Sequence, residues 1–266
     1  MCFLGVCLKY FNFVFLLLFI ISCNPNYNYE PVSLSKNKVA KISVSQVTKS
    51  FVKLHIKILA SMECPEGIEC DNVSIDAGSV VGSGTVIKKS MGGMKVLTAA
   101  HVCSPEDYSP TIMSFEKYGA KIEKEIIAMN FFGSTAKFEI EKIDKDVDIC
   151  ILKTSTIWEF TPIIEMSKSK PKRGQKIYIM GAPHGIFWPG TVLFFDGYYV
   201  GLDNDANAVY TIPAKPGTSG GGVLNEKGEL IGIIHSGLTN METVGFGTNY
   251  EITRDFTKYL KKHFIF

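Results

Sequence analysis

Short apolar runs separated by Gly, Pro, Asn and Asp make up most of the chain after about residue 50. Runs of four to ten residues, bounded by turn-forming residues, are typical of β-strands. The segments that we interpret as strands are 51–59, 80–87, 95–99, 149–152, 176–180, 191–200, 209–212, 230–235 and 245–252. The pattern predicts an all-β domain over residues 50–266.

The last segment of the chain has a different period. Within 253–263, Phe256, Tyr259 and Leu260 lie at positions i, i+3 and i+4, with lysines between them. This spacing places the apolar side chains on one side of a helix and the charged ones on the other. We therefore predict one helix, at the C-terminus, packed against the β domain.

The N-terminal segment has the pattern of a secretory signal. Residues 10–21 are apolar apart from Asn12 and follow the single positive charge of Lys9. The end of this run, Ile-Ile-Ser-Cys-Asn, resembles a bacterial lipobox, in which Cys23 would be lipidated and become the first mature residue. We predict a signal peptide over 1–22, a tether over 23–49 and an exported, membrane-anchored lipoprotein facing the periplasm or the cell exterior. A plain signal peptide and an uncleaved anchor are the alternatives.

Composition narrows the functional class. The chain has 266 residues, of which 46% are hydrophobic, and 28 Lys and Arg nearly balance 26 Asp and Glu. There is no dense basic cluster in the sequence, so we expect no nucleic-acid partner. The apolar content is sufficient for one large core or two adjoining smaller ones.

A serine lies in the most glycine-rich part of the sequence. Residues 216–222 read Pro-Gly-Thr-Ser-Gly-Gly-Gly, with Ser219 at the centre. Glycines allow a tight turn in which successive N–H groups point into one small space, where they can stabilise an oxyanion. Ser219 is therefore a candidate nucleophile.

Two candidate partners precede this serine. His101 ends the apolar run Val-Leu-Thr-Ala-Ala and is the only one of five histidines in such a setting, although a backbone carbonyl could also satisfy it. Asp148 leads into an apolar run and can be desolvated, whereas Asp144 and Asp146 alternate with lysines. A calcium loop over these aspartates is disfavoured, because Ile149 occupies the position that requires glycine. Histidine, aspartate and serine occur in the chain order of chymotrypsin-type peptidases.

Five segments together resemble trypsin-like serine peptidases, nearer to bacterial HtrA/Do and glutamyl endopeptidases than to digestive trypsins. They are 82–87 (GSGTVI), 97–101 (LTAAH), 148–153 (DICILK), 180–185 (MGAPHG) and 217–221 (GTSGG). The resemblance implies two six-stranded antiparallel β-barrels, divided near residues 155–175, with a C-terminal helix. We expect no PDZ domain in this chain, because no second domain follows the predicted helix.

The resemblance also implies an activity. His101, Asp148 and Ser219 would form the triad of a serine endopeptidase that passes through an acyl-enzyme, and the N–H groups of Gly217 and Ser219 would form the oxyanion hole. No cofactor and no metal are implied, and the partner is a protein or peptide substrate. A catalytically inactive, peptidase-like binding or adhesion protein at the cell surface is the alternative.

Substrate specificity is less sharply indicated. The pocket residues that the resemblance implies are Pro213, His235, Ser236, Gly237 and Asn249. Pro213 stands where trypsins carry the acid that binds basic side chains, so cleavage after Lys or Arg is not expected. His235 would meet an acidic side chain, as in glutamyl endopeptidases, or pack within the barrel. His184 is interpreted as a loop residue.

Cysteine usage fits export. Cys64 and Cys70 flank a turn that could close a small disulfide loop. Cys103 and Cys150 each follow a proposed triad residue by two positions, so an assembled triad would bring them close. Four cysteines allow three pairings. Metal binding by the four is disfavoured, because the sequence holds no CxxC pair among them.

Overall fold

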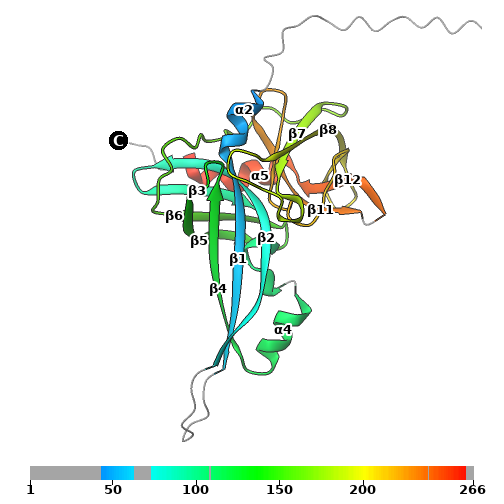
Figure 1. The fold of residues 1–266 in the computed structure, drawn as a ribbon. Helices are drawn as coiled ribbons and strands as arrows, with labels where there is room; N and C mark the ends of the chain where they lie inside the picture. The colour runs from blue at the N-terminus through cyan, green and yellow to red at the C-terminus, as the bar shows by residue number, and fades with distance from the viewer. Residues whose placement is uncertain (1–42, 63–72, 108, 239, 262–266) are drawn as a thin grey trace, which may run out of the picture. The chain divides into compact units, whose positions relative to one another are not determined.

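The computed structural model describes residues 43–62, 73–107, 109–238 and 240–261, within a compact unit that spans Val39–Phe266. Twelve strands in these ranges form two closed antiparallel barrels (Figure 1). The predicted signal peptide, Cys23, most of the predicted tether, Cys64 and Cys70 lie outside the described residues.

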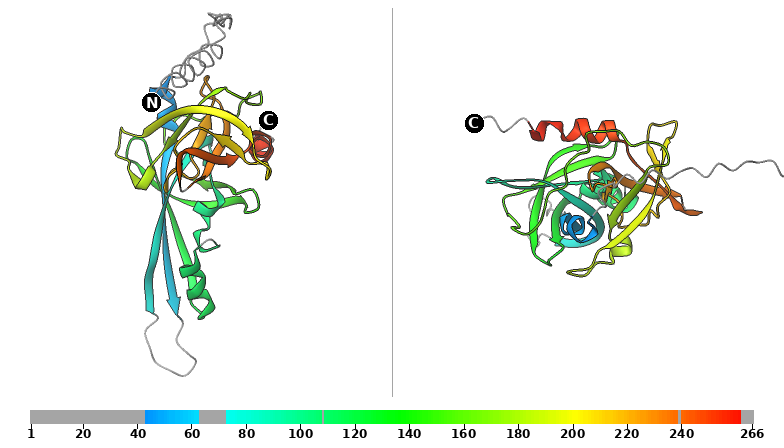
Figure 2. Two further views of the ribbon diagram at one scale, coloured as in Figure 1. Left: turned by 90° about the vertical axis from the view of Figure 1, so that its right-hand side faces the viewer. Right: turned by 90° about the horizontal axis from the view of Figure 1, so that it is seen from above.

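Barrel 1 contains the first six strands. They are β1 (Phe51–Met62), β2 (Val73–Ser90), β3 (Gly93–Thr98), β4 (Lys121–Asn130), β5 (Thr135–Asp144) and β6 (Ile149–Thr154), in the order β1-β2-β3-β6-β5-β4. The first two strands and β4 extend beyond the barrel as an arm, with α4 (Pro110–Lys117) beside it (Figure 2).

Barrel 2 contains the other six. They are β7 (Lys176–Gly181), β8 (Leu193–Leu202), β9 (Ala208–Tyr210), β10 (Gly222–Leu224), β11 (Leu230–Leu238) and β12 (Met241–Thr248), in the order β10-β11-β12-β9-β8-β7. Residues 155–175 connect the barrels. The predicted fold class, two six-stranded antiparallel barrels with a C-terminal helix, is confirmed.

Strand β1 shows how the sequence determines the core. Val52, Leu54, Ile56 and Ile58 are fully buried, whereas the residues between them are partly exposed. Side chains on a strand alternate between its two faces, so these four lie on the inner side of barrel 1. Each contributes about 1.5–3 kcal/mol through removal of apolar surface from water.

Strands β4 and β5 are not expected from the apolar runs. β5 alternates charged with apolar residues, as in Lys137-Phe138-Glu139-Ile140, and four of the first five residues of β4 are charged. Their polar faces carry ion pairs such as that between Lys137 and Glu125. An antiparallel strand with one wet face needs apolar side chains at only every second position, and such a strand contains no continuous apolar run.

The C-terminal helix begins earlier than predicted. β12 ends at Thr248, and α5 spans Tyr250–Thr257, followed by a 3₁₀ turn, η4 (Lys258–Lys261). The predicted strand 245–252 is therefore wrong at its end. The helix begins here because the Asn249 side chain accepts a hydrogen bond from the Ile252 amide at 3.0 Å and so caps the helix N-terminus.

The start of the described domain is also helical. Helix α2 (Val44–Val47) and the 3₁₀ turn η1 (Thr48–Ser50) precede β1, within the stretch that the sequence indicates as tether. Val47 is buried against barrel 1, and the Ser50 hydroxyl donates to the Val47 carbonyl at 2.6 Å. The folded domain thus includes residues from at least 43 onward.

Candidate active site

His101 lies where β3 gives way to a short helical turn, α3 (Ala100–Cys103). The Thr98 hydroxyl donates to the Ser83 carbonyl at 2.8 Å and holds the end of β3 against β2. Ala99 and Ala100 are completely buried, so this segment has little freedom. The His101 side chain is about one-quarter exposed, at 26%.

Asp148 is brought to His101 by the pairing of β3 with β6. Thr98 pairs with Cys150, so the residues just beyond β3 face those just before β6. One Asp148 carboxylate oxygen accepts from the His101 amide at 2.9 Å, and the other lies 2.8 Å from His101 Nδ1. Asp148 has a φ of +50°, which is uncommon for a residue with a side chain. The two hydrogen bonds offset that backbone cost.

The charge of Asp148 determines the state of the histidine ring. Burial opposes ionisation of Asp148, but hydrogen bonds from His101 and the nearby positive charge of a protonated His101 hold its pKa below the ordinary value of 3.8. Asp148 is therefore ionised at neutral pH. An ionised carboxylate at Nδ1 favours the proton on that nitrogen, which leaves Nε2 as the basic atom of neutral His101.

The turn that carries Ser219 packs against the same end of β3. Gly220 has a φ of +84°, and a Cβ added there would lie 2.9 Å from the Ala99 nitrogen and overlap the Thr98 hydroxyl. The Ser219 carbonyl accepts from the Ser83 amide at 2.8 Å. Ser219, in barrel 2, is therefore fixed beside the segment of barrel 1 that leads to His101.

Ser83, in the segment 82–87, is a buried link between the barrels, and its role is not evident from the sequence motif. Its hydroxyl donates to the Gly217 carbonyl at 2.7 Å and accepts from the Ala182 amide at 3.0 Å. The sequence feature that indicates a close contact here is Gly-Ser-Gly at 82–84. A Cβ at Gly82 would lie 2.5 Å from a Val102 methyl carbon. Small residues at this place allow barrel 2 to approach closely.

Two backbone amides in the Ser219 turn have no acceptor among the residues that the structure describes. The amides of Thr218 and Gly220 donate to the carbonyls of Lys215 and Ile234. Within the described ranges, by contrast, the amides of Gly217 and Ser219 donate no hydrogen bond. The two predicted oxyanion-hole amides are therefore the ones in this turn that have no protein acceptor among the described residues.

A hollow of about 420 Å³ lies beside Ser219. It is lined by His184, Ala214, Lys215, Pro216, Thr218, Ser219, His235, Ser236, Gly237 and Leu238. Of the residues predicted for the pocket, His235, Ser236 and Gly237 line this hollow, whereas Pro213 and Asn249 do not. Asn249 is buried and caps α5, and its side-chain amide donates to the Ala206 carbonyl at 2.8 Å.

His235 lies near the candidate residues Ser219 and Asp148 and also lines the hollow. Its carbonyl accepts a hydrogen bond from the Ser219 hydroxyl at 3.1 Å, and its Nδ1 lies 2.9 Å from the Ser236 hydroxyl. Burial lowers the pKa of His235, and the negative charge of Asp148 acts in the opposite direction. His235 is therefore neutral at neutral pH, with a polar tip that can contact a substrate.

His184 is a lining residue whose position depends on backbone geometry. It has a φ of +52°, and its amide donates to the Pro216 carbonyl at 2.6 Å. This bond ties the short 3₁₀ turn η3 (Pro183–Gly185) to the residue just before Gly217. The loop interpretation of His184 from sequence does not include this contact with the Ser219 turn.

Cys103 and Cys150 form a disulfide that joins α3 to β6, with 6.6 Å between their Cα atoms. Both are completely buried. Each follows its partner of the His101–Asp148 pair by two residues, so the bond fixes the two segments whose separation determines the 2.8 Å contact.

We predict that the double substitution Cys103→Ala and Cys150→Ala destabilises the domain by about 4 kcal/mol, because a loop of 47 residues is no longer closed in the unfolded chain. Chemical denaturation measures this loss. With Cys64 and Cys70 also replaced by alanine in both proteins, reducing agent should produce the same loss in the protein that keeps Cys103 and Cys150 and none in the variant that lacks them. Equal stability of the two proteins under oxidising conditions would show that the bond does not contribute.

Gly217 provides a test of the turn geometry. A Cβ at this position would overlap the Ala182 carbonyl and lie 3.2 Å from the Gly185 nitrogen. We expect Gly217→Ala to displace one oxyanion donor and lower kcat by about 10²–10³-fold. Gly174→Ala is the matched control, because its φ is also positive, at +75°, but its Cβ would meet open space. A similar loss in both variants would refute this explanation.

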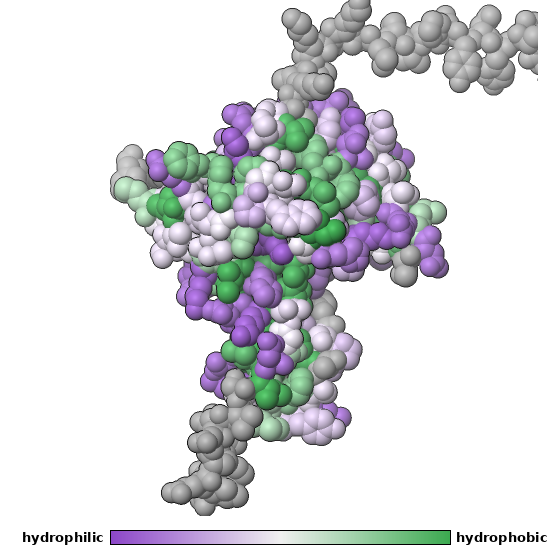
Figure 3. Space-filling view, in the orientation of Figure 1, coloured by the Kyte–Doolittle hydropathy of each residue, from purple (hydrophilic) through white to green (hydrophobic). Residues whose placement is uncertain are grey.

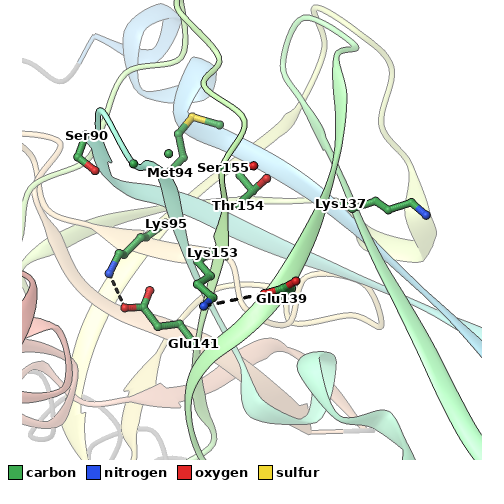
Figure 4. A pocket seen from close by; sticks show the side chains of 11 residues that line it. Ser90, Met94, Lys95, Lys137, Glu139, Glu141, Lys153, Thr154 and Ser155 are labelled. Atoms are coloured by element: carbon green, nitrogen blue, oxygen red, sulfur yellow. Dashed lines mark hydrogen bonds and ion pairs between the residues drawn. The ribbon is translucent and has the colours of Figure 1, made fainter.

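A separate hollow of about 600 Å³ lies on the outer face of barrel 1 (Figure 4). Its side chains form the ion pairs Lys95–Glu141 and Lys153–Glu139. None of His101, Asp148 and Ser219 lines it. It is a charged surface depression apart from the candidate site.

Two six-stranded antiparallel barrels, with the His101–Asp148 pair at the end of β3 and the Ser219 turn packed against that end, define the class of protein. Residues 82–233, more than half of the chain, match the family of the trypsin-like peptidase domain. The chain therefore belongs to the trypsin-like peptidase family.

Individual relatives are distant. The chain is 27% identical over 183 residues to "Serine protease HtrA-like" of Staphylococcus aureus strain USA300, and 26% identical to the protein of that description from strain MRSA252. Each match covers 62% of this chain but only 22% of the relative, so the chain spans less than a quarter of their length.

A solved structure supports the fold. The crystal structure of the serine endoprotease from Yersinia pestis matches with a TM-score of 0.57 at 18% identity. The match covers 83% of this chain and 65% of the other. At this identity the likeness concerns the arrangement of the barrels alone.

Proposed function

We propose that the protein is a serine endopeptidase with Ser219 as nucleophile, His101 as general base and Asp148 as the residue that orients the base. The observation that carries the proposal is the two-point hold of Asp148 on His101, through Nδ1 and through the backbone amide. Two further features support it: the Ser219 turn packs against the end of β3, and the Gly217 and Ser219 amides are unoccupied.

In the proposed reaction the Ser219 hydroxyl rotates from the His235 carbonyl toward His101. Its oxygen bonds to the carbonyl carbon of the substrate as its proton passes to Nε2 of His101. The amides of Gly217 and Ser219 hold the negative oxygen that results. The carbon–nitrogen bond then breaks, and the departing amine takes the proton from His101.

The second half of the reaction regenerates the enzyme. Water loses a proton to His101 and attacks the acyl carbon, and the Ser219 oxygen leaves and recovers that proton. Asp148 stays ionised throughout and stabilises the positive charge on the imidazole.

A burst experiment tests this proposal. With an activated ester as substrate, we expect rapid release of about one equivalent of alcohol per chain, followed by slower turnover, because deacylation is slower than acylation for such esters. Intact mass should show one acyl group on the chain. Linear release from time zero with no acyl mass would contradict a covalent intermediate.

We also propose that the protein is an exported lipoprotein, held at a membrane surface by lipid on Cys23. The support is the sequence: the apolar run 10–21 after Lys9, followed by the lipobox-like end at Cys23. Among the helices that the structure describes, none has the length and apolar character to cross a bilayer. The segment 1–42 lies outside that description.

Cys23→Ser tests the anchor. We expect the wild type to partition into detergent and the variant to remain unprocessed or soluble, because two acyl chains give stable membrane binding and a serine can carry neither. Mass spectrometry of the mature N-terminus checks the prediction. A first residue other than Cys23 without added lipid mass would replace lipidation with ordinary secretion or an uncleaved anchor.

A further inference from the structure

Exposed aromatic side chains gather at one end of barrel 1. Phe132 and Phe160 are 45% and 76% exposed, and their rings lie edge to face with centroids 6.4 Å apart. Phe131 packs against Phe132 with a centroid distance of 5.4 Å. Large apolar side chains clustered at a surface mark an interaction site more often than scattered ones do.

Trp188 lies on a tight turn that contacts the β4–β5 connection, which carries Phe131 and Phe132. Its side chain is 62% exposed, although its backbone pairs with Thr191 in both directions. The turn is attached to Phe131, whose carbonyl accepts from the Gly190 amide at 2.7 Å. A Cβ at Gly133 would lie 2.9 Å from a Pro189 carbon. We call Phe132, Phe160 and Trp188 the aromatic patch.

The aromatic patch lies at the end of barrel 1 where the described chain begins. Asn130, the residue before Phe131, pairs with Val52 near the start of β1. The Phe51 ring lies 5.5 Å from that of Phe187, the residue before Trp188. The helical residues 44–50 immediately precede β1, and Val44 in α2 is 42% exposed. In Figure 3 the surface at this end of the molecule mixes hydrophobic and hydrophilic residues.

We propose that the aromatic patch docks into the headgroup region of a lipid bilayer, and that this contact orients the catalytic domain on the membrane. The proposal rests on the lipoprotein anchor proposed above. Nineteen residues lie between Cys23 and Ser43, so the two are twenty positions apart in the chain. At about 3.5 Å per residue this stretch spans at most about 70 Å. The anchored domain therefore stays within reach of the bilayer.

The chemistry of the aromatic patch suits this occupant. Tryptophan is enriched at membrane interfaces, where its ring is half apolar and its N–H remains wet. A protein partner commonly needs about 800 Å² of surface on each side, whereas three side chains offer less. A tethered domain needs only a weak second contact, because the anchor already holds it at high local concentration.

The two tryptophans of the chain allow a direct test. Trp158 is 6% exposed and packs against Phe138, whereas Trp188 belongs to the aromatic patch. We expect the full-length protein, reconstituted in phosphatidylcholine vesicles, to lose tryptophan emission when the acyl chains carry bromine. Trp188→Phe should abolish this loss, because buried Trp158 does not contact lipid. Equal emission in brominated and plain vesicles would overturn the proposal.

Matched variants distinguish binding through the aromatic patch from non-specific binding of exposed aromatic side chains to lipid. The double substitution Phe132→Ser and Phe160→Ser should reduce the bromine quenching of Trp188. Tyr118→Ser should not, because Tyr118 is equally exposed, at 76%, but follows α4 on the arm. Thermal unfolding of each variant verifies that the domain is folded. Quenching that is unchanged in the double variant would contradict the assignment of the patch.

Two other results would show that the aromatic patch does not bind a bilayer. A blue shift of Trp188 emission that grows with protein concentration in the absence of vesicles would replace the bilayer with a second copy of the chain. Protein that does not float with vesicles would also overturn the proposal, together with the anchor. Active-site labelling of the same sample then shows whether the peptidase assignment stands independently.

Discussion

Ser219→Ala is expected to abolish peptide-bond hydrolysis, with a loss in kcat of about 10⁶-fold, the scale seen when the nucleophile of such a triad is removed. The unfolding temperature should change little, because the hydroxyl makes only a 3.1 Å hydrogen bond to the His235 carbonyl and packs no core. Cleavage of a peptide library and thermal unfolding measure the two effects.

Ser236→Ala is the control for the nucleophile. Ser236 lines the same hollow, and its hydroxyl contacts His235, but it lies outside the glycine-rich turn. We expect this variant to retain kcat within a few fold and at most alter substrate preference. Full activity in Ser219→Ala would remove the central assignment.

The second large effect is expected for Asp148→Asn, with a loss of about 10⁴-fold, as is typical when the acid of this triad becomes an amide. The amide can donate to Nδ1 and so favours the wrong histidine tautomer. Asparagine also tolerates a positive φ, so the +50° backbone at this position can persist and the change isolates the charge.

Asp146→Asn is the control for the acid. Asp146 is exposed two residues earlier, and its amide bonds to Asp144 rather than to His101. Its substitution should leave kcat/KM nearly unchanged. A severe loss in Asp146→Asn with a mild one in Asp148→Asn would show that the wrong aspartate has been assigned.

The apolar pattern predicts strands where apolar residues dominate and fails where charged residues do. β6 begins with the apolar run 149–152, and β1 carries a buried apolar residue at every second position from Val52 to Ile58. β4 and β5 have one wet face, and their charges interrupt every run. The boundary between β12 and α5 at Asn249 is also not predicted from the apolar pattern, because the pattern continues through it. The helix begins there because the Asn249 side chain caps it in the folded chain.

For the candidate site, the local sequence predicts which residues could react but not how they are supported. His101, Asp148 and Ser219 each lie beside an apolar or glycine-rich segment that can be read directly. Ser83 acts through contacts with Gly217 and Ala182, about a hundred residues or more away in sequence. Only the folded barrels bring those groups together.

The residues that line the hollow beside Ser219 are also only partly predicted from the sequence. An alignment with the family implies Pro213 and Asn249, yet neither lines the hollow. Lys215 and His184 do, because the turn before Ser219 and the η3 turn meet through the bond between the His184 amide and the Pro216 carbonyl. Lys215 also pairs with Glu242 at the hollow's edge. Substrate preference therefore depends on loop contacts that motif spacing does not encode.

Reaction with a fluorophosphonate tests the central claim most directly, because this reagent labels a serine only when a neighbouring base activates it. We predict one phosphonyl adduct per chain, located at Ser219 by peptide mass spectrometry, with strongly reduced labelling in His101→Ala and none in Ser219→Ala. Absence of labelling in the folded wild-type protein, or labelling at another residue, would contradict the assignment of Ser219 as an activated nucleophile.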